Sequence, residues 1–174
     1  MFLNILVALD GSPDSDEALG QAIDLAYSEH ARLTLFSAVV APPAVAYLAV
    51  SGSVVTELLR DAAANTDAVL RRALERVPDA VSVSIVRSTE PVRDALLDQI
   101  RRGNYDLVVM GSRGRGAVRA ALLGSTSHHV LHHSAVPVLI VRAERAPQIE
   151  PAVAASRQGP RPPAGATSGR ELPR

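Results

Sequence analysis

The residues best suited to chemistry lie in one glycine-rich segment, GSRGRGAVRAALLGSTS, at positions 111–127. Glycine lets a backbone approach a polyanion closely, because it has no side chain beyond Cα. A helix is expected to begin near the end of this segment. There the first N–H groups lack partners within the helix, and the helix dipole favours negative charge. These expected donors are the backbones of Gly124, Ser125, Thr126 and Ser127.

Hydroxyls and arginines add to the backbone donors of this segment. Three hydroxyl residues occupy positions 125–127, and the guanidinium groups of Arg113, Arg115 and Arg119 match the geometry of phosphate oxygens. Tight turns alone, without any ligand, also explain glycines in a loop of this kind. The length of the loop, and a glycine followed by three hydroxyl residues, favour a phosphate-binding site built without lysine.

A second candidate group is Asp10, which ends an apolar run at residues 3–9. Open α/β sheets bind ligands at the carboxyl ends of strands, at the point where the strand order reverses. If the strands ending at Asp10 and Gly111 are neighbours there, both residues face one crevice. Asp10 could then accept from ribose hydroxyls or help to hold Mg²⁺ on phosphates. Taken alone, the residue favours a simpler role, an Asp that forms a turn before Gly11.

Composition excludes several classes of protein. All 18 basic residues are arginine, and cysteine is absent. Without lysine the chain cannot carry a GxxxxGK[ST] phosphate loop, a Schiff-base lysine or the strand lysine of protein kinases. Without cysteine it has no disulfide, thiolate nucleophile or zinc–sulfur site. The formal net charge is zero, which disfavours nucleic-acid binding.

The amino-terminal sequence MFLNILVALD has no basic segment and is interrupted by Asp10, so we expect no signal peptide and a cytoplasmic protein. Residues 33–56 carry no charge and are long enough to span a bilayer. Pro42 and Pro43, with the Ser-Gly-Ser at 51–53, would break a helix there. A buried strand is therefore expected in the first half of this segment, and no membrane span.

Short apolar runs alternate with amphipathic segments along the chain. Strands are expected at residues 3–9, 32–40, 81–87, 107–110 and 137–142, with helices beginning near 12, 54, 91 and 125 and the second reaching about 77. This alternation predicts an α/β fold with a five-stranded parallel sheet and helices on both faces.

The last part of the chain differs in composition from the rest. Residues 144–174 hold half of the twelve prolines and show no apolar periodicity. We therefore predict one domain at residues 1–143 and a disordered tail at 144–174. An arm that binds phosphate or a partner is the alternative role for this tail.

Four segments together resemble the universal stress protein family, over about residues 1–143. They are ILVALDGS (5–12), the strand from Leu33 to Val40, YDLVVMGSRGRG (105–116) and LLGSTSHHVLHHSAVPVLIV (122–141). The most specific match is the pattern G-x2-G-x9-G-[ST], met by Gly111, Gly114, Gly124 and Ser125. In this family the pattern marks the branch that binds ATP.

The resemblance implies a fold, a ligand and a set of binding residues. The sheet would have the order 3-2-1-4-5, and the ligand would be ATP or a related adenine nucleotide, with Mg²⁺. The residues implied at the ribose and adenine are Ala8, Leu9, Asp10 and either Ala38 or Val39. Those implied at the ribose and phosphates are Met110, Gly111, Arg113, Gly114, Gly124, Ser125, Thr126 and Ser127.

Two positions depart from the family pattern. Ser37 stands where the family usually has His, and Thr89 stands where Gly often precedes the acidic-Pro pair. Neither lies in the expected phosphate site, so neither weakens the expectation of nucleotide binding much.

Two further features concern the closing helix and strand. The sequence HHVLHH places His128 with His132 and His129 with His133 on shared helix faces, but no third metal ligand is evident. A surface or dimer-facing helix is therefore favoured over a metal site.

The strand at 138–141 would form a sheet edge, and the resemblance implies a homodimer through it.

Three functions fit these observations. The favoured one is a regulatory protein of the stress response that binds adenine nucleotide. The second is a slow ATPase or phosphotransferase, although no committed base or nucleophile other than Asp10 lies near the expected phosphates. The third is a dimeric interaction module that binds no ATP.

Overall fold

The computed structural model describes residues 1–41, 52–116 and 122–144. Its elements are β1 (Asn4–Ala8), α1 (Pro13–Glu29), β2 (Arg32–Ala38), α3 (Gly52–Leu74), β3 (Val83–Ser88), α4 (Val92–Arg102), β4 (Leu107–Gly111), α5 (Ser125–His133) and β5 (Val138–Val141). Arg119 and residues 145–174 of the predicted tail lie outside the described residues. The disorder of the tail therefore stays a prediction.

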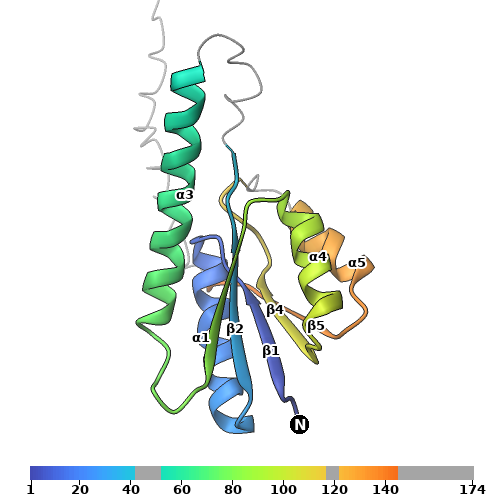
Figure 1. Ribbon diagram of the computed structural model, residues 1–174. Helices are drawn as coiled ribbons and strands as arrows, with labels where there is room; N and C mark the ends of the chain where they lie inside the picture. The colour runs from blue at the N-terminus through green and yellow to red at the C-terminus, as the bar shows by residue number, and fades with distance from the viewer. Residues whose placement is uncertain (42–51, 117–121, 145–174) are drawn as a thin grey trace, which may run out of the picture. The chain divides into compact units, whose positions relative to one another are not determined.

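The five strands form one parallel sheet with the order β3-β2-β1-β4-β5 (Figure 1). The predicted fold class and strand order are therefore confirmed. Strand β1 pairs with β2 on one side and with β4 on the other, and Ala8 lies opposite both Phe36 and Met110. The direction in which the chain adds strands to the sheet reverses between β1 and β4. The residues after Ala8 and those after Met110 therefore meet where the carboxyl ends of these two strands lie side by side.

Helices cover both faces of the sheet, and each face has its own apolar core (Figure 1). Side chains of a parallel strand alternate between faces, so Ile5 and Val7 point to the side of α1 and α3, while Leu6 points to the side of α4 and α5. All three are fully buried. Burial of each such aliphatic side chain contributes roughly 1.5–3 kcal/mol to folding.

Helix α1 begins as the sequence indicates. The Ser12 hydroxyl accepts the N–H of Ser15 at 3.3 Å, Pro13 occupies the first helical turn, and Asp14 and Asp16 stand near the positive end of the helix dipole. The helix ends at His30, whose φ of 56° places it in the left-handed region. The start of α1 is therefore fixed by local side-chain bonding directly after β1.

Several predicted boundaries are wrong by a few residues, for identifiable reasons. Helix α3 ends at Leu74 rather than Val77, because the N–H groups of Arg76 and Val77 bond to carbonyls three residues back and close a tighter turn. Strand β5 starts at Val138, since Pro137 has no N–H to give to the sheet.

Of the uncharged segment at 33–56, residues 33–38 lie in β2 and 52–56 in α3.

Across the described ranges, no helix is both long enough and apolar enough to cross a membrane.

Candidate functional site

A pocket lies at the edge of the sheet where β1 and β4 end. Its apolar wall is lined by Ala8, Leu9, Phe36, Val40, Val92, Leu96 and Met110. Its polar side is lined by Asp10, Ser15, Gly111, Arg113, Gly114, Thr126 and Ser127. The structure thus places an apolar cavity beside the glycine segment and the first turn of α5, at the reversal of strand order.

Most of the predicted binding residues line this pocket, and four do not. Ala38 lines a second pocket between the end of β2, α3 and the glycine segment, whereas Val39, Gly124 and Ser125 line neither. Sequence reasoning missed the apolar wall made by Phe36, Val40, Val92 and Leu96. Their apolar character was visible, but only the tertiary structure shows that they face a cavity.

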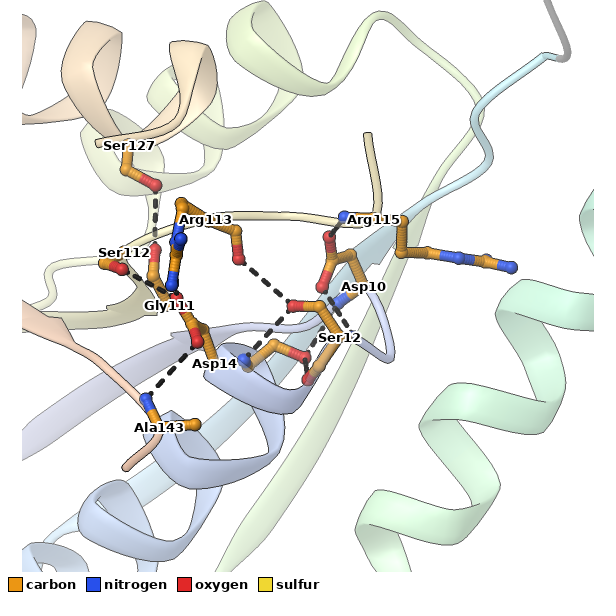
Figure 2. Close-up of polar contacts among 10 residues, drawn as sticks. Asp10, Ser12, Asp14, Gly111, Ser112, Arg113, Arg115, Ser127 and Ala143 are labelled. Carbon is orange, nitrogen blue, oxygen red and sulfur yellow. Dashed lines mark hydrogen bonds and ion pairs between the residues drawn. The ribbon is translucent and has the colours of Figure 1, made fainter. Parts of the chain in front are cut away.

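Asp10 joins the two halves of the site. One carboxylate oxygen accepts the N–H of Ser12 at 3.0 Å, and the other accepts the N–H of Arg115 at 3.0 Å (Figure 2). The turn-forming role is therefore present, and the same side chain also faces the glycine segment. A Cβ on Gly114 would lie 2.5 Å from the Asp10 carboxylate, so any larger residue there would displace Asp10.

Asp14 holds three segments of the chain together. Its carboxylate accepts the hydroxyl of Ser112 at 2.6 Å and the N–H of Ala143 at 3.3 Å, and it lies 3.5 Å from Nε of Arg113 (Figure 2). Asp14 is 6% exposed. Burial, the largest influence, opposes ionisation, but the bonds from Ser112 and Ala143 together with Arg113 outweigh it. The pKa of Asp14 is therefore below its ordinary value.

The side chain of Arg113 lines the pocket, and its Nε faces Asp14. The Arg113 side chain is 4% exposed. The backbone carbonyl of Arg113 accepts the Ser12 hydroxyl at 3.2 Å. One guanidinium nitrogen has no hydrogen-bond partner among the described residues. The expected cation at this position is thus engaged in holding the glycine segment against α1.

Arg115 extends away from Asp10 toward α3 (Figure 2). When the Asn65 amide takes the orientation that satisfies both groups, its oxygen accepts from the Arg115 guanidinium. The backbone N–H of Arg115 therefore donates to Asp10, while the guanidinium group of Arg115 lies at the second pocket, which Asn65 also lines.

The start of α5 is only partly as the sequence predicts. The N–H of Gly124 is not free, because it donates to the Ser112 carbonyl at 2.7 Å. The Ser127 hydroxyl donates to the Gly111 carbonyl at 2.8 Å. The N–H groups of residues 125–127 belong to the first helical turn, which offers them no intrahelical acceptor. Thr126 and Ser127 of this turn line the pocket.

An open parallel α/β sheet of order β3-β2-β1-β4-β5, with helices on both faces, defines a protein of the Rossmann-like class. The model of the universal stress protein family matches residues 1–142, and the chain belongs to that family.

The chain is similar to known members across most of its length. It is 32% identical over 149 residues to the universal stress protein YxiE of Bacillus subtilis, a match that covers 82% of this chain and 100% of that protein.

Solved structures of the family also resemble the chain. The universal stress protein UspA from Lactobacillus plantarum has a TM-score of 0.69 and 26% identity, over 80% of this chain and 97% of that one. A universal stress protein crystallised in complex with cAMP has a TM-score of 0.57 and 26% identity, over 82% of this chain and 98% of that one.

We predict that Asp14→Asn destabilises the protein in a manner that depends on pH. The folded pKa of Asp14 lies below the unfolded value of about 3.9, so its stabilisation is present above that pH and is lost as the pH falls through the folded pKa. Loss of the charged hydrogen bonds should lower the free energy of unfolding by about 1.5–3 kcal/mol at neutral pH. Chemical denaturation of both proteins, at neutral pH and near pH 3, measures the difference.

The matched control is Asp98→Asn. Asp98 pairs with Arg101 and Arg102 on the exposed face of α4, where such pairs contribute less than about 1 kcal/mol. An equal effect of both substitutions, or a difference for Asp14→Asn that does not shrink in acid, would contradict the role given to the buried carboxylate.

Proposed function

We propose that this chain binds ATP or a related adenine nucleotide at the pocket between β1, β4 and α5, and acts as a nucleotide-dependent regulator in the stress response. One observation carries the proposal. An apolar cavity opens directly onto Gly111, Gly114 and the first turn of α5. A planar base needs an apolar cavity, and a phosphate chain needs glycine backbone and the start of a helix. The family member bound to cAMP supports an adenine nucleotide as the ligand.

Each part of the nucleotide has matching residues. The adenine would lie against the apolar wall, with Phe36, Val40 and Met110 among its contacts. Asp10 would accept from the ribose hydroxyls. The phosphates would lie at the N–H groups of residues 125–127, beside the exposed backbone of Gly114.

Mg²⁺ fits this arrangement as a companion of the nucleotide. Among the described residues, no group of three or more acidic or histidine side chains gathers to hold a metal. Mg²⁺ is commonly held by one or two carboxylates, phosphate oxygens and water. Asp10 is the carboxylate on the pocket wall, so as the alternative to a ribose contact it would orient the ion that the triphosphate brings. The ion would supply charge neutralisation of the phosphates.

Gly124→Val should weaken ATP binding by about a hundredfold or more, equivalent to roughly 2.7 kcal/mol. A Cβ on Gly124 would lie 3.3 Å from Cα of Arg113 and 3.4 Å from the Ser112 carbonyl, so a branched side chain would separate α5 from the glycine segment. Calorimetry with ATP, AMP and a non-hydrolysable ATP analogue, each with and without Mg²⁺, measures the affinities.

Gly52→Val is the control, because a Cβ at Gly52 meets no atom within 4 Å. It should bind ATP like the parent protein, and thermal melting should show that both variants fold. Unchanged affinity in a folded Gly124→Val variant would place the nucleotide elsewhere. No binding by the parent chain itself would leave the dimeric interaction module as the better function.

The enzymatic alternative makes a different prediction. On the described pocket wall, Asp10 is the sole carboxylate, and both its oxygens already accept backbone N–H groups. The wall holds no histidine. We therefore expect phosphate release from ATP slower than about one per second, the low end of ordinary enzymes. A steady-state phosphate assay measures it, and faster turnover that is lost in Asp10→Asn would make the chain an ATPase.

We further propose a homodimer that pairs through β5, and a cytoplasmic location, where ATP is available. Strand β5 is an edge of the sheet, and Leu139 on it is 37% exposed. Leu131 on α5 is 47% exposed. An uncovered apolar edge strand is suited to pairing with another chain.

Leu139→Arg should convert the dimer to a monomer, because it places a charge in the middle of the paired edge. Ile85→Arg is a matched control, since Ile85 is 46% exposed on β3, the opposite edge of the sheet. Light scattering after gel filtration gives the mass of each. A monomeric parent chain, or a dimer that only Ile85→Arg disrupts, would contradict pairing through β5.

A further inference from the structure

Four histidines lie on α5, outside the pocket, in two pairs one helical turn apart. The rings of His129 and His133 are stacked, with centroids 4.3 Å apart and planes at 27°. The rings of His128 and His132 are 4.5 Å apart and tilted by 54°. Only Ser127 and Val130 of this helix are buried, so the imidazoles remain at least partly accessible to solvent. Neither pair has a part in the proposed nucleotide site.

One hydrogen bond distinguishes the two pairs. Nδ1 of His133 lies 2.8 Å from the carbonyl oxygen of His129. A carbonyl can only accept, so Nδ1 of His133 must carry the proton. In the neutral ring, Nε2 then keeps its lone pair. Donation of the second ring nitrogen to a carbonyl is the arrangement that orients histidines which bind metal ions. Nε2 is therefore the nitrogen of His133 that can bind a metal ion.

The surroundings of this pair also suit a cation. His129 is half-buried, so its ring has fewer rotamers to lose on binding. His133 is the last residue of α5, where the free carbonyls carry partial negative charge. Two nitrogens that each bind one ion at about 2.0–2.1 Å can be at most about 4 Å apart. The stacked rings, with centroids 4.3 Å apart, lie on one face of α5, and rotation about the side-chain torsions would turn one nitrogen of each toward a shared ion.

We propose that His129 and His133 form a binding site for a late divalent transition-metal ion on the solvent side of α5. Imidazole nitrogen suits Cu²⁺, Ni²⁺ and Zn²⁺, with Cu²⁺ bound most tightly. No group of three or more possible metal ligands gathers among the described side chains, so water fills the remaining coordination positions. The site is thus open and exchangeable, and it is independent of the nucleotide pocket.

The test uses the full chain without a polyhistidine tag and without nucleotide. Calorimetric titration with NiCl₂, CuCl₂ and ZnCl₂ compares the parent with the double variants His129→Gln/His133→Gln and His128→Gln/His132→Gln. The first variant should bind about tenfold more weakly or worse, and the second should stay within about threefold of the parent. Electron paramagnetic resonance of the Cu²⁺ complex should show two coordinating nitrogens in the parent and in the second variant only.

A variant with all four helix histidines changed to Gln sets the baseline, and circular dichroism checks that α5 is retained. If the first double variant unfolds, His133→Gln alone should still remove one coordinating nitrogen from the Cu²⁺ spectrum. Parent affinity no greater than this baseline, equal loss in both double variants, or a larger loss in His128→Gln/His132→Gln would overturn the site.

Discussion

The close contact between the glycine segment and the start of α1 is the constraint on which the rest of the structure depends. A Cβ on Gly111 would lie 2.8 Å from the backbone of Asp14 and Ser15, so the end of β4 can meet α1 only without a side chain. Asp14 then binds Ser112, Arg113 and the chain after β5 at once. A carboxylate buried this deeply is stable only because these donors compensate for the lost water.

This contact shapes the pocket as much as it stabilises the fold. Ser112, Arg113 and Arg115 each hydrogen-bond to α1 or to the turn that precedes it. Residues 112–115 are therefore held in place before any ligand arrives, which lowers the entropy lost on binding. The same bonds use groups that appear in the sequence as free ligands, among them Nε of Arg113 and the N–H of Gly124. What remains for a phosphate is mostly backbone, which agrees with the proposed role of binding a nucleotide.

The closing helix has two chemically separate ends. Its first turn contributes Thr126 and Ser127 to the pocket wall, and its last turn carries His132 and His133 near the carboxyl-terminal carbonyls. An anion at one end and a cation at the other both complement the helix dipole. The helix packs against α4 and β5, so it also adjoins the edge through which a second chain would pair.

By itself, the sequence determined the α/β alternation and the cap at Ser12, and it predicted that Asp10 meets the glycine segment on condition that β1 and β4 are neighbours. These follow from local propensity and from the rule that parallel strands end at one edge. Only the tertiary structure decided that Arg113 pairs with Asp14, that Gly124 donates to Ser112, and that Phe36 and Val92 face a cavity. A residue type states which bonds a side chain can make. Which partner it finds among several far along the chain depends on how the elements pack, and spacing does not encode that choice.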